Sequence, residues 1–316
     1  MDGPHFPPMK YIRAVFSPAE PLRLQAYAGA AWRGAFGHAL KKTVCVAGLR
    51  PCSGCPMASL CLFPLLFPAE PRSNEGPARF ATPPPPFVLA PDPTPRKGFL
   101  APEERIEVRL LLLGQAAANA PYLLHALIEA ARGGIGRSRT PLRPVGLGQA
   151  GGPLLAPDTA GFAAALAPFS PKAPPLPSSL ALRFLTPLRL RVENDLLTAK
   201  TFTPRHLVTA ALRRTRLLLG WPEEPLAAAL RQASAALSWQ APRFGWLETA
   251  HRSTRQGSLM RFGGIVGESG LALSGLPEEM KELLWLASLL HVGKGASMGF
   301  GRIALEGGGP RESGAG

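Results

Sequence analysis

All four cysteines of the chain lie in one short stretch, CVAGLRPCSGCPMASLC. They are Cys45, Cys52, Cys55 and Cys61, with the spacing C-x6-C-x2-C-x5-C. Thiolates at this spacing can surround one metal ion, and the CxxC pair across a Ser-Gly turn is the strongest part of the pattern. We expect a structural zinc ion in preference to an iron–sulfur cluster, which C-x2-C-x5-C also permits, and in preference to two disulfides.

An ion held by four thiolates has no open coordination position, so it would not take part in catalysis. The cysteine stretch begins seven residues after His38. We therefore expect the ion to fix the end of the helix that carries this histidine.

A second stretch, GKGASMGFGRI at 293–303, is rich in glycine and carries Lys294, Ser297 and Arg302. A predicted helix precedes it and a predicted strand follows it, whereas a nucleotide-phosphate loop has a strand first and a helix second. This order excludes an ATP site. One glycine can end a helix, but four of them (Gly293, Gly295, Gly299 and Gly301) indicate a backbone that something approaches closely.

The charge of the chain points to a polyanionic partner. It has 35 Lys plus Arg against 21 Asp plus Glu, for a net charge of +14. An excess of this size favours RNA or DNA as the partner. The sequence has no long apolar run and does not begin with a secretory pattern, so we expect a cytoplasmic location and no membrane partner.

Two proline-rich runs, at 82–98 and 167–179, are typical of extended connectors. Periodic structure resumes on both sides of the second run. The predicted organisation is therefore an N-terminal domain at 1–166, a linker at 167–179 and a C-terminal domain at 180–316.

Hydrophobic periodicity predicts nearly the same series of elements in each half. The first half gives strand, helix, two strands, helix and strand at 9–17, 28–43, 85–90, 104–113, 117–131 and 142–148. The second gives the same order at 180–192, 204–219, 243–251, 258–267, 277–290 and 300–306, with an extra helix at 223–236.

Both halves also place a Gly/Arg loop between the last helix and the last strand. In the first half this loop is RGGIGRSRTPL, with Arg137 and Arg139. The repeated order β-α-β-β-α-β predicts an α+β fold of two tandem ferredoxin-like, or RRM-like, domains, with the four-cysteine metal knuckle inserted in the first.

Several stretches together resemble a known family. They are AWRGAFGHALKKTVC, RFLTPLRL, HRSTRQGSLMRFGGIVGE and GKGASMGFG, in the context of tandem ferredoxin-like domains. This combination is similar to the CRISPR-associated pre-crRNA-processing endoribonucleases of the RAMP superfamily, and the resemblance covers most of the chain.

The resemblance implies an endoribonuclease that binds CRISPR repeat RNA and cuts once per repeat without a catalytic metal. The ribose 2′-hydroxyl would attack the adjacent phosphate and leave 2′,3′-cyclic phosphate and 5′-hydroxyl ends. The glycine-rich loop would approach the RNA backbone, with Lys294 and Ser297 as its polar contacts. Assembly with subunits of a CRISPR effector complex is a further expectation.

The family often carries its general acid or base histidine on the first helix, which here contains His38. Trp32, Phe36 and Leu40 form the apolar stripe of that helix, so His38 should face away from the core. Lys42, with Lys41 as the alternative, would assist as a cation, and Tyr27 would share the azimuth of His38 if the helix starts early enough.

Arginines elsewhere should hold the RNA. In RSTRQ, Arg252 and Arg255 are interleaved with Ser253, Thr254 and Gln256, whose side chains are donors suited to phosphate and 2′-hydroxyl groups. Two rival interpretations stay open: an RNA-binding subunit of the same fold that does not cut, and a zinc-stapled DNA-binding or structural protein.

Overall fold

The computed structural model describes residues 6–68, 84–93, 98–193, 195–252 and 259–306, with the backbone alone at 250–252 and 259–260. The chain divides into two compact units, Pro7–Phe169 and Ser170–Gly316, with Met1–Phe6 grouped with the second. The division falls inside the proline-rich segment expected to link the domains.

The N-terminal unit is built on a four-stranded sheet. Its strands are β1 (Met9–Pro18), β3 (Phe87–Pro91), β5 (Ile106–Leu113) and β6 (Leu142–Gln149), in the spatial order β3-β5-β1-β6. All neighbours are antiparallel, and Arg13 at the centre of β1 lies opposite Arg109 on one side and Gly148 on the other. A separate two-stranded pair joins β2 (Leu22–Arg23) to β4 (Phe99–Leu100).

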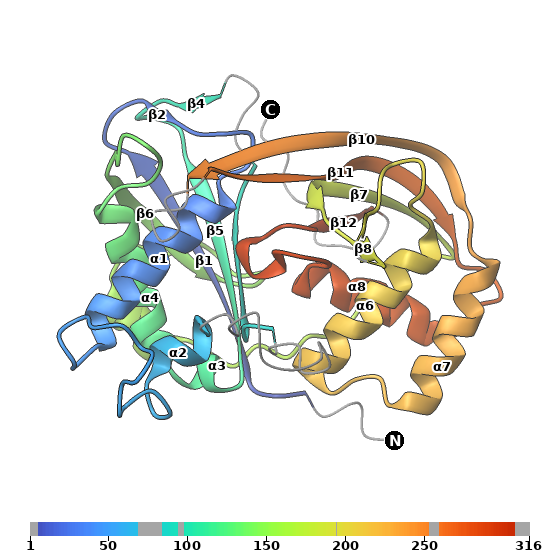
Figure 1. The fold of residues 1–316 in the computed structure, drawn as a ribbon, viewed down its shortest axis with the longest axis horizontal. Coiled ribbons are helices and arrows are strands. Elements are labelled where there is room, and N and C mark those ends of the chain that lie inside the picture. Colours follow the sequence, from blue (N-terminus) through green and yellow to red (C-terminus); the bar gives the residue numbers. More distant parts are fainter. Residues whose placement is uncertain (1–5, 69–83, 94–97, 194, 253–258, 307–316) are drawn as a thin grey trace. The chain divides into compact units, whose positions relative to one another are not determined.

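Two helices, α1 (Gly29–Val44) and α4 (Ala120–Arg132), pack against each other over one face of this sheet (Figure 1). Shorter helices are α2 (Leu62–Leu66), α3 (Gln115–Ala118) and α5 (Thr159–Ala165). Alternate residues of β1 (Ile12, Ala14 and Phe16) point into the core and meet the α1 stripe of Trp32, Phe36 and Leu40.

The C-terminal unit repeats this arrangement. Its sheet contains β7 (Ser179–Leu188), β10 (Trp239–Arg252), β11 (Leu259–Ala272) and β12 (Ile303–Glu306), in the order β10-β11-β7-β12. Helices α6 (Pro204–Leu219) and α8 (Glu278–Leu290) pack together on this unit (Figure 1). Minor elements are β8 (Arg191–Val192), β9 (Asp195–Leu196), α7 (Glu224–Ala233), η1 (Ser234–Ala236) and η2 (Ala296–Met298).

Each unit therefore has the element order and strand order of a ferredoxin-like domain, which confirms the predicted fold class. The expected strand at 180–192 ends earlier, at Leu188, and the expected helix at 117–131 is divided into α3 and α4 at Asn119. None of the helices in the described ranges combines the length and apolarity needed to cross a membrane.

The β10–β11 hairpin is longer than the sheet it belongs to. β7 pairs with β11 only over Ile265–Ala272, whereas β10 pairs with β11 out to Arg252 and Leu259. The outer part of the hairpin is therefore a two-stranded ribbon. Gly267, with φ of +118°, lies where the pairing with β7 shifts its register.

A strap after β6 extends the sheet of the N-terminal unit at one edge. Leu155 exchanges two backbone hydrogen bonds with Leu147, at N···O distances of 2.7 and 3.1 Å. A Cβ on Gly148 would lie 2.9 Å from the carbonyl oxygen of Pro153, so only glycine lets the strap approach this closely. Arg13 holds the strap by donating to the carbonyl of Gly152 and also pairs with Glu107.

Candidate functional site

The exposed face of α1 carries Gly34, His38 and Lys42 at intervals of one helical turn. All three residues are exposed, while Phe36 and Leu40 between them are fully buried. The expectation that His38 faces away from the core is therefore confirmed. An imidazole and an ammonium group thus lie near each other on a solvent-facing helix surface.

The two glycines inside α1 have different surroundings. A Cβ on Gly37 would lie 2.9 Å from the ring of Phe67, so Gly37 is required for that phenylalanine to pack on the helix. A Cβ on Gly34 would meet nothing within 4 Å. Glycine in a helix interior costs about 0.5–1 kcal/mol relative to alanine, and packing does not explain this cost at Gly34.

The two lysines of α1 also differ. The Lys41 ammonium donates to the carbonyl oxygens of Leu49 and Arg50, at 3.1 and 2.8 Å. Among the described residues, no hydrogen bond or ion pair engages the Lys42 ammonium. Lys41 therefore holds the cysteine loop, and Lys42 is the cation that remains free to meet a ligand beside His38.

The expectation that Tyr27 shares the helical azimuth of His38 is wrong, because α1 begins at Gly29 and Tyr27 precedes it. Tyr27 is 4% exposed. Burial raises the pKa of its phenol well above the usual value of 10.0, and the charge of Asp92 raises it further. The phenol is therefore protonated at neutral pH, and its catalytic role stays a prediction.

Arg137 and Arg139 are both exposed on the loop between α4 and β6. Gly134, with φ of +89°, lets this loop fold back on itself, because a Cβ there would lie 2.1 Å from the Arg139 carbonyl oxygen. Gly136 packs on the backbone of Arg23, shortly before α1. The loop that carries the two arginines therefore packs on the segment at 22–24.

The glycine-rich loop of the C-terminal unit packs against its own chain. Gly293, Gly295, Gly299 and Gly301 all have positive φ. A Cβ on Gly301 would lie 1.9 Å from the Val292 carbonyl oxygen, and one on Gly293 would lie 2.5 Å from that of Arg189. The close approach that the surplus glycines predicted is made at these two positions by the backbone of the chain itself, and their contact with RNA stays a prediction.

Hydrogen bonds to backbone carbonyls fix this loop to β7 and the residue after it. The Lys294 amide donates to the carbonyl of Arg189, and the Thr186 hydroxyl donates to that of Gly299. Lys294 is exposed, whereas Ser297 and Arg302 are 8% and 5% exposed. Of the three polar residues predicted here to contact RNA, the structure presents Lys294 to solvent.

The structure describes only part of the arginine-containing segment RSTRQ, at the outer end of the β10–β11 hairpin. Arg252 ends β10, and the structure gives its backbone alone. Arg255 and Gln256 lie outside the described residues. Their contact with RNA stays a prediction.

The four cysteines converge on one small cavity. They are half-buried and none forms a disulfide. All four line a cavity of about 20 Å³ together with Lys41 and Arg50. Within the described ranges, no group of three or more histidine, cysteine, aspartate or glutamate side chains is already close enough together to hold a metal ion.

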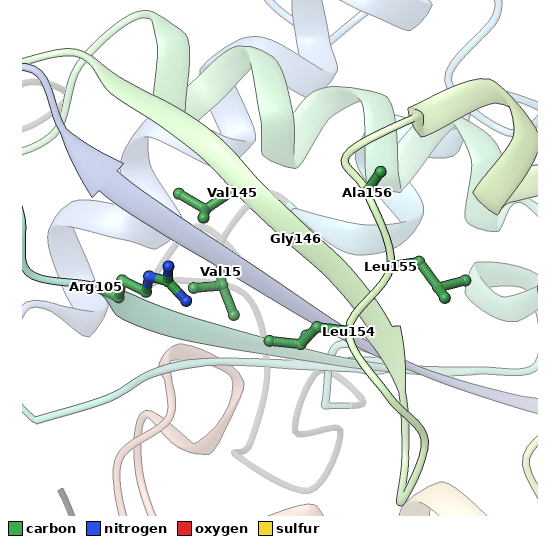
Figure 2. A pocket seen from close by; sticks show the side chains of 7 residues that line it. All are labelled: Val15, Arg105, Val145, Gly146, Leu154, Leu155 and Ala156. Atoms are coloured by element: carbon green, nitrogen blue, oxygen red, sulfur yellow. The ribbon is translucent and has the colours of Figure 1, made fainter.

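A larger cavity of about 260 Å³ lies where the strap passes β6. Figure 2 shows Leu154, Leu155 and Ala156 on the strap and Arg105 on the other side of the cavity. Its remaining lining comes from Val15, Val145 and Gly146. The cavity can bind a small group, but its lining includes no nucleophile or general base, and none of the predicted site residues lies in it.

Two family models match separate parts of the chain. A model described as the AF_1859_N N-terminal domain matches residues 6–150. The model of the CRISPR-associated endoribonuclease Cas6 matches residues 182–303. The Cas6 match therefore covers most of the C-terminal unit. The sequence matches none of the curated proteins.

Solved Cas6 structures share the fold over nearly the whole chain. Thermus thermophilus Cas6 has 18% identity and a TM-score of 0.53, with 95% of this chain and 99% of that chain covered. A Cas6 product complex gives 20% identity and a TM-score of 0.55, with 94% and 99% covered. The structural matches show that these proteins share the fold of this chain, including the tandem ferredoxin-like domains.

A longer protein carries the same fold as one of its parts. In a partial Cas6-RT-Cas1–Cas2 complex, the match has 13% identity and a TM-score of 0.58. It covers 96% of this chain but 46% of that one. The fold of this chain therefore matches a little under half of that longer chain.

The open surface at Gly34 was not identified from the sequence. The sequence also did not predict that Lys41 binds the cysteine loop while Lys42 stays exposed. Gly34 could have been found from its position one turn before His38, because an exposed helix-interior glycine has an energetic cost that needs a reason. The role of Lys41 depends on the path of the loop at 46–60, which the spacing of the cysteines does not predict.

Proposed function

We propose that this Cas6-type chain is an endoribonuclease that binds CRISPR repeat RNA and cuts pre-crRNA within each repeat. The observation that carries the proposal is the pairing of exposed His38 with the free ammonium of Lys42, one turn further along α1. The solved Cas6 product complex, whose fold this chain shares, supports RNA as the substrate class.

The proposed reaction is a transesterification that needs no water and no catalytic metal. The 2′-oxygen attacks the adjacent phosphorus as it loses its proton, and the bond from phosphorus to the 5′-oxygen breaks. The 5′-oxygen takes up a proton. The products are a 2′,3′-cyclic phosphate on one fragment and a 5′-hydroxyl on the other.

His38 can take part in either proton transfer, because one ring nitrogen of an imidazole can accept a proton and the other can donate one. Lys42 would stabilise the extra negative charge on the phosphorane oxygens as the 2′-oxygen attacks. The open surface at Gly34 would allow the ribose-phosphate backbone to lie close to α1, next to the imidazole.

Exposed cations in both units would bind the rest of the repeat. Arg137 and Arg139 are exposed on the loop between α4 and β6, and Lys294 is exposed on the glycine-rich loop. Phosphate contacts of this kind give affinity that falls with salt, while the RNA stem and a few bases supply selectivity. Assembly with other CRISPR subunits is part of the proposal, since a related fold occurs in a Cas6-RT-Cas1–Cas2 complex.

The test is cleavage of the repeat RNA encoded next to the gene by purified protein in excess EDTA. A 2′-deoxy substitution at the cut site and the variant His38→Ala are run in parallel. The proposal expects wild-type protein to cut, the deoxy substrate to resist, and the variant to bind RNA without cutting it. Analysis of the fragment ends should show the cyclic phosphate.

Three results would overturn parts of the proposal. Tight binding of the repeat with no cleavage by wild-type protein would make the chain a guide-RNA holder. Cleavage that the variant retains in full would remove His38 from the chemistry. Equal affinity for DNA of the same sequence would favour a DNA-binding protein.

A further inference from the structure

The cysteine loop is anchored to a helix at each end. Cys45 directly follows α1, and its amide donates to the Lys41 carbonyl, while Cys61 directly precedes α2. Between them, the amide of Cys55 donates to the carbonyl of Cys52 at 3.2 Å, which forms the turn of the CxxC pair. The four thiols therefore come from two helix ends and one tight turn.

Little apolar burial holds this loop in place. Val46 and Leu60 are 85% and 82% exposed, and Leu49 and Met57 are exposed as well. A segment that leaves its apolar side chains in water lacks the hydrophobic contribution that normally stabilises a fold. Another interaction is needed to hold it, and bound metal ions supply this in small segments.

The cavity that all four cysteines line has the size for a single ion. Its volume of about 20 Å³ is close to that of one water molecule's site. An iron–sulfur cluster, with several iron and sulfide atoms, would need a much larger space. The surroundings therefore favour zinc over a cluster.

The charges around the cavity fit the same ion. Four thiolates around Zn²⁺ carry a net charge of about −2, because each ligand loses its proton on binding. Lys41 and Arg50 both line the cavity, and the Lys41 ammonium is fixed there by the carbonyls of Leu49 and Arg50. Two cations thus stand next to the predicted negative charge.

We propose that Cys45, Cys52, Cys55 and Cys61 bind one Zn²⁺ ion that joins the end of α1 to the start of α2. The thiols are not yet at ligating separations, so the loop closes around the ion until each Zn–S distance reaches about 2.3 Å. The ion is structural, and the proposal stands whether or not the chain cuts RNA.

The experiment measures metal content on full-length protein purified without chelators, by elemental mass spectrometry. The expected result is one zinc per chain, and thiol titration after chelation should recover four thiols. Removal of the ion by a strong chelator should lower the melting temperature of the wild-type protein. Replacement by Co²⁺ should give the visible absorption of tetrahedral cobalt thiolate.

The variants are Cys52→Ser and, as the matched control, Ser53→Ala in the same turn. Cys52→Ser should lose zinc, whereas Ser53→Ala should keep one ion per chain. If the purified protein contains iron and acid-labile sulfide in place of zinc, the four cysteines hold an iron–sulfur cluster and the zinc proposal is wrong. Wild-type protein without metal, or with its cysteines in two disulfides, would overturn the proposal even if Cys52→Ser fails to fold.

Discussion

The ammonium groups of Lys41 and Lys42, adjacent in sequence, are engaged in different ways. Lys41 donates two hydrogen bonds to the cysteine loop, and its ammonium lies 5.6 Å from the centre of the Phe63 ring. Lys42 lies one turn after His38 and is exposed. Lys41 thus stabilises the cysteine loop, and Lys42 lies on the surface that we propose binds RNA.

Alanine at each position should separate the two roles. Lys42→Ala should slow single-turnover cleavage on the order of tenfold to a hundredfold with an unchanged melting temperature, because it removes charge stabilisation only. Lys41→Ala should cost about 1 kcal/mol of unfolding free energy, near the low end for hydrogen bonds of a charged group that is partly exposed. If Lys42→Ala cleaves at the wild-type rate, Lys42 has no part in the reaction.

Gly34→Ala should stabilise the protein and yet reduce its binding or cleavage of RNA. Alanine should add about 0.5–1 kcal/mol to the free energy of unfolding, since a helix-interior glycine is replaced and the new methyl meets nothing. The same methyl would stand where we propose that the RNA backbone approaches, so RNA affinity or cleavage should fall. Thermal unfolding and RNA-binding titrations measure the two effects.

Gly37→Ala is the matched control for this variant. Its methyl would collide with the Phe67 ring, so it should lower the melting temperature instead of raising it. A Gly34→Ala protein that is more stable and fully active would show that the open surface at this position is not used.

The glycine-rich loop should respond differently to changes in backbone and side chain. Gly301→Ala should destabilise the C-terminal unit by several kcal/mol, because it strains a positive φ of +65° and forces the methyl against the Val292 carbonyl. Lys294→Ala should leave the melting temperature unchanged and reduce the dependence of RNA affinity on salt by about 0.7–0.9 in log–log slope. Affinity of Lys294→Ala equal to wild type at every salt concentration would exclude this contact.

Tyr27 makes stability sensitive to alkaline pH. Its folded-state pKa is raised by burial, so the phenol ionises in the unfolded chain near pH 10 before it can ionise in the folded one. Stability should therefore be independent of this group below about pH 10 and should fall as pH rises above it. The free energy of unfolding of Tyr27→Phe, measured by urea unfolding, should fall less steeply than that of the wild type between pH 9 and about 11.

The same variant tests the predicted catalytic role of Tyr27. A phenylalanine retains the ring and removes the hydroxyl. Cleavage that persists at the wild-type rate would confine Tyr27 to packing, whereas loss of cleavage with normal RNA binding would retain it in the reaction.

The fold could be predicted from the sequence because apolar periodicity repeats in both halves. The α1 stripe of Trp32, Phe36 and Leu40 predicted the exposure of His38 correctly. The predicted start of this helix, at residue 28, lies within one residue of the observed start at Gly29, so the earlier start that the placement of Tyr27 required does not occur. Contacts distant in sequence, such as Gly293 against Arg189, have no local signal, so the packing role of the loop glycines emerged only in three dimensions.

The strap beside β6 has a consequence for how the protein behaves at high concentration. A bare sheet edge offers unpaired amide and carbonyl groups to any other chain with a similar edge. The pairing of Leu155 with Leu147 satisfies such groups on β6 within the molecule. A shortened chain that lacks residues 150–157 could keep its ferredoxin-like core and still aggregate, so solubility would depend on a segment that carries none of the residues proposed for catalysis.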